Sequence, residues 1–338
     1  MTNVLNTLYV TVPEAWVGLE GETLRVKVGS ETRVEVPLHH LVSVVCFQQV
    51  RMSGEAMLAC HQRGVSVVWL GFGGRFLARV EGAPGHTATL RRAQFRAADD
   101  PQRTLALARG FVGGKIANSR TVLRRASRTR DDRTEALDRA ADRLQALGAR
   151  VLDAPDLDVL RGVEGEAAAR YFEVFDAMLA DDDLRFEKRS RRPPENPVNA
   201  LLSFGYALLS ADCVAALNGA ALDPAVGFLH IERSARPALA LDLMEEFRAA
   251  AVDRMVLAMI RRRQVDAADF ETLPTGEVRM KDAARRAFLA EYQKRKQETV
   301  THPATGQEGT WGLMVHLQAR QLARAIRGEG DYVPFLLR

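Results

Sequence analysis

The spacing of apolar residues changes near residue 85 of the 338-residue chain, and this change constrains the fold more than any other feature. In residues 23–28 and 32–36, apolar and polar side chains alternate, which is typical of half-buried β-strands. Later in the chain, apolar residues recur three and four positions apart, as in amphipathic helices. The sequence therefore predicts a two-domain α+β protein, with a small β-sandwich-like domain over residues 1–90 and a larger all-α domain over residues 98–338.

Local signals predict the elements of both domains. A helix is expected over residues 53–63, with Ser53 as its cap. Residues 98–328 are expected to be helices joined by loops, of which the longest are 181–197 and 299–311. Apolar runs predict further strands of the first domain at residues 8–12, 41–47, 65–70 and 76–80.

Basic residues exceed acidic ones by a small margin, but they cluster. The formal net charge is +4, the pI is about 9.1, and 41 of the 47 basic residues are Arg. Such clusters can neutralise the phosphates of a nucleic acid. Solvated helix faces and the Arg codons of a GC-rich genome explain the same pattern, so the clusters alone do not show whether the protein binds nucleic acid. The clusters lie at residues 109–130, 185–192, 261–263 and 294–296.

Cysteine spacing and hydropathy argue against several other classes of protein. Cys46, Cys60 and Cys213 are far apart and form no CxxC pair, which argues against a zinc site or a redox motif. The N-terminus has no basic segment followed by an apolar run, and no stretch approaches the roughly 18 consecutive apolar residues of a membrane span. We therefore expect a cytoplasmic protein that does not bind membranes.

Glu164 is a carboxylate inside an apolar helical stripe. In residues 156–179 it falls between Leu160 and Ala168, on the face that is expected to point to the core. A charge at such a place costs several kcal/mol unless it is compensated. The alternative is a position at the edge of the stripe, with Arg161 as an ion-pair partner.

A second group of ionisable residues lies in residues 238–247, which are apolar almost all round. Asp242 and Glu245 are three residues apart and share one face. Glu246 falls on a different side and is expected in solvent or in a salt bridge. Upstream, His230 follows an apolar run directly, although a single histidine of this kind is more often an ordinary, partly buried one.

Carboxylates and an imidazole in apolar settings suit a divalent cation, which supplies the positive charge that they need. Oxygen ligands with one imidazole favour Mg²⁺ or Mn²⁺ over zinc. Such an ion can bind phosphate oxygens and stabilise charge on an attacking or leaving oxygen. If these segments lie together, they predict a metal-dependent phosphodiester enzyme. A metalloenzyme for a small molecule is the alternative, and it predicts no salt-dependent DNA affinity.

Four segments resemble, in order and approximate spacing, the motifs of the CRISPR-associated integrase family (CRISPR-associated protein 1). Ala238 and Ala249 stand where the family often has Ser and Pro, and neither change removes a proposed ligand. The four segments are residues 161–172, 194–206, 227–230 and 239–248. Three further segments, residues 5–11, 37–39 and 332–335, resemble the type I-C branch of the family.

The resemblance implies a homodimer formed through the β-domain, and an α-helical catalytic domain. It implies Glu164, His230 and Glu245 as catalytic ligands of Mg²⁺ or Mn²⁺, with Asp242 as a further candidate ligand. It implies double-stranded DNA as the partner, both a spacer fragment and the CRISPR repeat, and a 4:2 complex with a dimer of CRISPR-associated protein 2. Each 3′-hydroxyl of the fragment would attack a phosphodiester of the CRISPR array.

Each candidate DNA-binding residue has a second explanation. Arg248 matches the family's Arg beside the acidic pair, and it can contact phosphate or pair with Glu245. Asn199 and Asn196 can bind DNA, but Asn196 can equally cap a turn or a helix. Tyr171 can face the site, although packing is the favoured alternative.

A non-catalytic DNA-binding scaffold dimer of the same fold is the main rival to the enzyme. The intact set of Glu164, His230 and Glu245 argues against a scaffold, because a scaffold has no use for buried, unpaired acids. The enzyme therefore requires that the helix around Glu164 and the segment from His230 to Glu245 meet in space.

Overall fold

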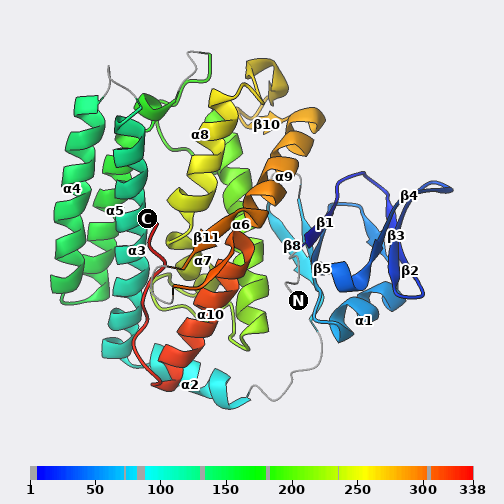
Figure 1. The fold of residues 1–338 in the computed structure, drawn as a ribbon, viewed down its shortest axis with the longest axis horizontal. Helices are drawn as coiled ribbons and strands as arrows, with labels where there is room; N and C mark the ends of the chain where they lie inside the picture. The colour runs from blue at the N-terminus through cyan, green and yellow to red at the C-terminus, as the bar shows by residue number, and fades with distance from the viewer. Residues whose placement is uncertain are drawn as a thin grey trace. The chain divides into compact units, whose positions relative to one another are not determined.

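The computed structural model divides the chain into two compact units, residues 1–86 and 87–338. The first is rich in strands, and the second, larger unit is mainly helical (Figure 1). This order of elements confirms the prediction of a mixed α+β protein with strands first and helices after them. The described residues are 6–71, 74–81, 88–129, 134–179, 183–234, 236–302 and 306–337.

The strands described in the first unit form two four-stranded sheets. One sheet has the order β1-β5-β7-β8, in which the first three strands are parallel and β8 is antiparallel. The other has the order β4-β3-β2-β6, with antiparallel pairing except between β2 and β6. The strands are β1 (Asn6–Val10), β2 (Trp16–Glu20), β3 (Thr23–Val28), β4 (Glu31–Pro37), β5 (Leu41–Phe47), β6 (Arg51–Met52), β7 (Ser66–Leu70) and β8 (Phe76–Arg79).

Helix α1 (Gly54–Gln62) connects these sheets into one core. The hydroxyl of Ser53 caps the helix by accepting a hydrogen bond from the backbone N–H of Ala56 at 3.1 Å. Buried side chains from α1 and from both sheets form one apolar cluster. The sheets therefore share a core, as a β-sandwich-like unit requires. The parallel pairing of β5 with β7 is an addition to that expectation, and α1 provides the crossover that it needs.

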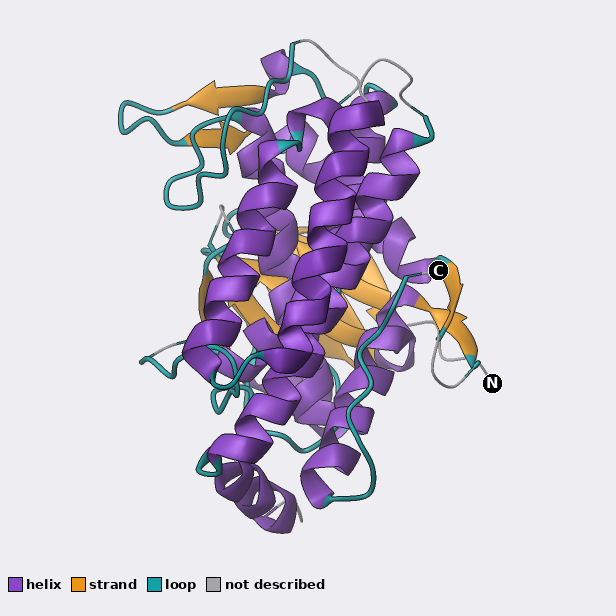
Figure 2. Cartoon of the chain, turned by 90° about the vertical axis from the view of Figure 1, so that its left-hand side faces the viewer, coloured by secondary structure: helices purple, strands orange, loops and turns teal. Residues whose placement is uncertain are grey.

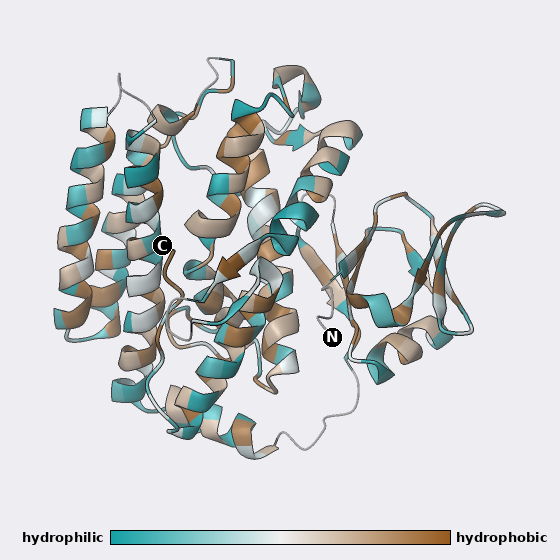
Figure 3. Cartoon of the chain, viewed as in Figure 1, coloured by the Kyte–Doolittle hydropathy of each residue, from teal (hydrophilic) through white to brown (hydrophobic). Residues whose placement is uncertain are grey.

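Amphipathic helices make up most of the second unit, and Figure 2 shows several of them side by side. In α4, buried residues recur at three- and four-residue intervals, and Figure 3 shows the matching alternation of hydrophobic and hydrophilic residues. The helices are α2 (Ala88–Ala98), α3 (Pro101–Ser127), α4 (Thr134–Asp153), α5 (Leu157–Glu173), α6 (Pro197–Gly219), α7 (Ala238–Glu245), α8 (Arg254–Arg261), α9 (Asp282–Gln297) and α10 (Trp311–Arg327). A π-helical turn, η3 (Arg248–Asp253), joins α7 to α8.

The second unit is not all-α, which corrects the prediction. Strands β9 (Phe270–Thr272) and β10 (Val278–Met280) form one antiparallel hairpin. Strands β11 (Thr299–Thr301) and β12 (Glu308–Thr310) form another. Each strand has three residues, so no alternating pattern is long enough to be visible in the sequence.

Helix α6 is the apolar centre of the second unit. Its length and its mean hydropathy of 1.7 over an 18-residue window would suffice to cross a membrane, although 67% of that window is buried inside the protein. It packs against α7, α10 and η3, so neighbouring helices cover its apolar surface. The core position of α6 therefore explains its hydropathy.

The C-terminal segment lies against the end of α7, and this contact corrects the expectation that Glu246 faces solvent. Glu246 is fully buried, and its carboxyl accepts hydrogen bonds from Tyr332 Oη and from the backbone N–H of Phe335. Asn118 of α3 donates to the backbone carbonyls of both Glu246 and Phe335, at 2.7 and 2.8 Å. Because α7 ends at Glu245, a helical wheel does not predict the direction of the next side chain.

Candidate active site

Two of the predicted ligands meet at a lysine on a third helix. Lys115 of α3 makes an ion pair with Glu164 of α5, and its Nζ lies 2.7 Å from Oε2 of Glu245 at the end of α7. The exposed fraction of the side chain is 13% for Lys115, 26% for Glu164 and 4% for Glu245. The structure thus brings together two carboxylates that are far apart in the sequence, with a positive charge between them.

His230 lies beside the same carboxylate. Its Nε2 is 3.8 Å from Oε1 of Glu245, and its Nδ1 is 2.7 Å from Oδ1 of Asp242. A carboxylate on one ring nitrogen is the usual partner of a metal-binding histidine, because it fixes the ring and leaves the other nitrogen free to coordinate. The imidazole therefore presents Nε2 to the side of the site where the glutamates converge.

Asp242 is a positioning residue in this structure, which argues against the prediction that it is a further ligand. It is fully buried, and Oδ2 accepts hydrogen bonds from the backbone N–H groups of Phe228 and Leu229, at 2.6 and 3.0 Å. Its Oδ1 accepts from the backbone N–H of His230 at 2.9 Å as well as facing the imidazole. Both carboxylate oxygens are therefore engaged in holding the loop that carries His230.

Two further contacts fix this loop. A Cβ atom on Gly227 would lie 2.8 Å from Cβ of Ala238 and 2.9 Å from Oδ2 of Asp242, so only glycine allows so close an approach to α7. Arg161, one turn before Glu164, donates from Nε and Nη2 to the carbonyl of Leu229 at 3.0 and 2.9 Å. Arg161 therefore ties α5 to the loop instead of pairing with Glu164.

The donor set suits a divalent cation of the Mg²⁺ or Mn²⁺ class. Glu164 and Glu245 supply carboxylate oxygens and His230 supplies one imidazole nitrogen, which is the oxygen-rich set that these ions prefer. The ammonium group of Lys115 lies between the carboxylates, where positive charge is required. Within the described residues, no group of three or more His, Cys, Asp or Glu side chains is close enough to hold an ion without adjustment.

Positive neighbours keep Glu245 ionised although it is buried. Burial by itself raises the pKa of this carboxyl, but the charges of Arg248 and Lys115 outweigh burial and lower its pKa to about 2. Arg248 Nε lies 3.0 Å from Oε1 of Glu245, and its guanidinium stacks 4.6 Å from the ring centroid of Tyr206. Of the two roles expected for Arg248, the structure shows the pairing with Glu245.

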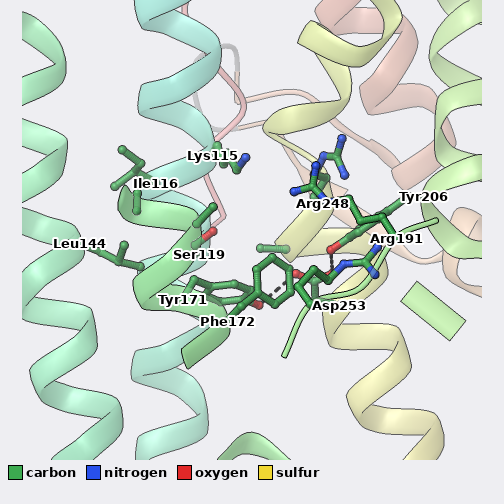
Figure 4. A pocket seen from close by; sticks show the side chains of 14 residues that line it. Lys115, Ile116, Ser119, Leu144, Tyr171, Phe172, Arg191, Tyr206, Arg248 and Asp253 are labelled. Carbon is green, nitrogen blue, oxygen red and sulfur yellow. Dashed lines mark hydrogen bonds between the residues drawn. The ribbon is translucent and has the colours of Figure 1, made fainter. Parts of the chain in front are cut away.

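A basic pocket adjoins these residues (Figure 4). On one side of it, the buried carboxyl of Asp253 accepts hydrogen bonds from Tyr206 Oη at 2.6 Å and from Tyr171 Oη at 3.0 Å. Several positive groups line the same pocket and carry the charge that a phosphate group needs. These groups are Lys115, Arg189, Arg191 and Arg248.

Three residues proposed to bind DNA have structural roles in this arrangement. Tyr171 is buried and bonded to Asp253, and it also lines the basic pocket, so packing and a position at the site are both seen. Asn196 caps α6 by accepting from the backbone N–H of Asn199 at 2.8 Å. Asn199 is fully buried, and its Oδ1 accepts from Arg189 Nη1 at 2.7 Å. Direct DNA contact by Asn199 is therefore not supported, because its side chain holds the segment before α6.

Sequence reasoning missed the central role of Lys115. In the sequence, Lys115 stands out only as one of the basic residues of segment 109–130. A sharper signal was available, because Lys115 lies four residues after Phe111 and four before Ser119, on a helix face that is otherwise buried. A lysine on a buried face needs a carboxylate partner, just as Glu164 needs a cation.

Comparison with known proteins identifies the family to which the chain belongs. The family model of CRISPR associated protein Cas1 matches residues 8–294. A CRISPR-associated endonuclease Cas1 of Chlorobaculum tepidum is 46% identical over 343 residues, which cover 100% of both chains. A casposase bound to integration product has the same fold, with a TM-score of 0.84 at 23% identity over 98% of this chain and 93% of that one.

A Cas6-RT-Cas1–Cas2 complex contains a similar chain, with a TM-score of 0.83 at 26% identity over 99% of this chain and 36% of that one. The family match extends over most of both units. On this evidence, the chain belongs to the Cas1 family of CRISPR-associated proteins.

Proposed function

We propose that the protein is a metal-dependent DNA integrase and endonuclease of CRISPR adaptation, which inserts short spacer DNA into a CRISPR array. The observation that carries the proposal is the convergence of Glu164, Glu245 and His230, from three segments of the chain, beside a basic pocket. The relative named a CRISPR-associated endonuclease supports the same class of reaction.

Glu164, His230 and Glu245 would hold Mg²⁺ or Mn²⁺, which supplies positive charge to the attacking and leaving oxygens of a phosphodiester. The chain's own residues prepare the ligands for this role. Asp242 orients His230, and Arg248 orients Glu245. The cationic side chains of the pocket would bind the non-bridging phosphate oxygens and hold the DNA strand at the site.

Strand transfer conserves phosphodiester bonds. The 3′-oxygen of the spacer forms a new bond to phosphorus while the bond to a 3′-oxygen of the array strand breaks, and the proton of the attacking hydroxyl ends on the leaving oxygen. No external energy source is required, because one phosphodiester replaces another. Endonucleolytic cleavage differs only in that water takes the place of the attacking hydroxyl.

The proposed partners follow from the family. They are double-stranded DNA, as spacer fragment and CRISPR repeat, a second copy of the chain in a homodimer, and a Cas2 dimer in a 4:2 complex. The related chain in a complex with Cas2 supports Cas2 as a partner, and the 4:2 stoichiometry rests on the family resemblance alone. We further propose a cytoplasmic location without membrane binding. We also propose that the protein belongs to the type I-C branch, because three segments of the chain resemble that branch. The identity of the genes that neighbour its own gene tests this proposal.

A strand-transfer assay tests the proposal with purified protein, Mn²⁺ or Mg²⁺, a short duplex and a supercoiled plasmid, with and without Cas2. Glu164→Gln should abolish insertion of the duplex while DNA binding is retained. Glu166→Gln is the matched control, because Glu166 lies two residues further along α5 and pairs with Arg143 and Arg150 instead of Lys115. It should insert DNA at the rate of the wild type.

Three outcomes would contradict the proposal. If Glu164→Gln inserts DNA as well as the wild type, the site is not where strand transfer occurs. If the wild type binds DNA but neither cuts nor joins it with any divalent metal, the non-catalytic scaffold dimer is the better description. Binding of DNA that does not weaken as salt is raised would instead favour an enzyme for a small molecule.

A further inference from the structure

Lys115 occupies the point at which the carboxylates of two helices meet. Its Nζ contacts Glu164 and lies 2.7 Å from Oε2 of Glu245, and all three side chains are largely buried. Two carboxylates that share a site repel each other unless a positive charge lies between them. In this arrangement, the ammonium group supplies that charge and joins α3 to both α5 and α7.

The two glutamates already have two cationic partners. Glu164 and Glu245 carry two negative charges, and Lys115 and Arg248 carry two positive ones within ion-pair distance. The nearby carboxylate of Asp242 is engaged by the loop of His230. Even with the negative charge of Asp242 counted, a divalent cation on the same two glutamates would leave an excess of one positive charge in a mostly buried place, which is unfavourable. One of the two cationic side chains must therefore leave the carboxylates when the ion binds.

Lys115 is the side chain that can leave. The guanidinium of Arg248 is held on the ring of Tyr206, with 4.6 Å between the guanidinium carbon and the ring centroid. Lysine, in contrast, carries its charge on a flexible four-carbon stem. Lys115 also lines the adjoining pocket, as do Arg189, Arg191 and Arg248, so its ammonium group can reach a phosphate that binds there.

We infer that Lys115 competes with the divalent cation for Glu164 and Glu245, and that the ion releases the ammonium group to phosphates in the adjoining pocket. The inference rests on the proposed function, because it takes both glutamates as metal ligands. The coupling is reciprocal: a phosphate that holds Lys115 in the pocket leaves the carboxylates free for the ion. Lys115 is therefore a positioning residue that couples metal binding to DNA binding.

Titration of Mn²⁺ into the full-length protein, followed by calorimetry, tests the competition. Lys115→Met should bind Mn²⁺ roughly tenfold more tightly than the wild type, because the competing charge is lost. Lys296→Met is the matched control. Lys296 Nζ lies 2.7 Å from Oδ1 of Asp212 in a different buried pair, so its loss should lower stability without changing the affinity for Mn²⁺.

The coupling to DNA is measured with a short duplex in the same proteins. Mn²⁺ should raise the DNA affinity of the wild type more than that of Lys115→Met, whereas Lys296→Met should behave as the wild type. If Lys115→Met binds Mn²⁺ no more tightly than a wild type that does bind it, the inference fails and the proposed function stands. If the wild type binds no Mn²⁺, both fail.

A measurement on the wild type decides the question if Lys115→Met does not fold. The chain has only six lysines, so mass spectrometry can follow the acetylation of each one by acetic anhydride. Mn²⁺ should make Lys115 react several-fold faster than it does in EDTA, while the rate at Lys296 stays constant. A rate at Lys115 that is unchanged or lower with Mn²⁺ would overturn the inference.

Discussion

The backbone N–H of Phe335 donates a hydrogen bond to Oε2 of Glu246, so the C-terminal segment is tied to the residue that directly follows Glu245. The same carboxyl accepts a hydrogen bond from Gln318 Nε2 of α10 at 3.0 Å. One buried carboxyl therefore joins the C-terminal segment, α10 and the end of α7. Through this contact, the last residues of the described chain support the helix end that presents Glu245.

Replacing Phe335 with Ala should destabilise the second unit. Phe335 is 2% exposed, and its ring centroid lies 5.3 Å from that of Phe247 and 5.2 Å from that of Trp311. Phe335→Ala should lower the free energy of unfolding by about 3–5 kcal/mol in urea denaturation, because it leaves a cavity between aromatic rings. Leu336→Ala is the control, since Leu336 is 38% exposed and should contribute about 0.5 kcal/mol or less. Equal stability of the two variants would show that the segment does not support α7.

Asp242→Asn should weaken metal binding although Asp242 is not proposed as a ligand. The amide group of Asn would place a donor against the backbone N–H groups of the loop, or against Nδ1 of His230. Loss of such a partner should weaken Mn²⁺ binding roughly 10- to 100-fold in calorimetry. Asp158→Asn is the control, because the side chain of Asp158 is 93% exposed. Wild-type affinity in Asp242→Asn would contradict the positioning role.

The fold was predictable where its signals are local. The alternating pattern of residues 23–28 matches β3, and the cap at Ser53 matches the start of α1, because a strand period and a helix cap involve only neighbouring residues. The hairpins at residues 270–280 and 299–310 were not predictable, since their strands are too short to show a period. Only the turn at Gly276, with its φ of +80°, marked the first of them.

The sequence predicts which residues belong to the candidate site, but not which of them contact one another. Glu164 and Glu245 can be recognised as candidates from the sequence alone, because they are carboxylates among apolar residues. Their meeting depends on the packing of α3, α5 and α7, which no local spacing encodes. The same limit applies to Asp242 and Glu245, which share a helix face. Only the backbone N–H groups of the His230 loop distinguish the positioning residue from the proposed ligand.

Asp253 should make stability depend on pH. Burial raises the pKa of this carboxyl from 3.8 to about 6, despite hydrogen bonds from Tyr206 and Tyr171. The folded state thus holds the proton more tightly than the unfolded state. The resulting contribution of Asp253 to the free energy of unfolding is therefore fully present below pH 3.8, and it is lost as pH rises through about 6. Asp253→Asn does not titrate. The free energy of unfolding of the wild type, relative to this variant, should fall by about 1 kcal/mol between roughly pH 5 and pH 7.5 in urea denaturation. A relative stability that rises with pH would contradict the shift.

Arg191 should contribute one phosphate contact to DNA binding. Its side chain is exposed and lines the basic pocket. Arg191→Ala should weaken the binding of spacer-like and unrelated duplexes to the same extent, because phosphates carry no sequence information. The slope of log affinity against log salt, measured by fluorescence anisotropy, should become shallower by about 1.

Arg139→Ala provides the comparison for this measurement. Arg139 is 70% exposed on α4 and pairs with Glu135 one turn away, so its loss removes the same charge outside the pocket. If both variants change the slope equally, DNA responds to net charge and not to this pocket. If only Arg191→Ala changes it, the phosphate backbone passes through the pocket that Lys115 also lines. DNA would then lie within reach of the carboxylates of Glu164 and Glu245, as strand transfer at this site requires.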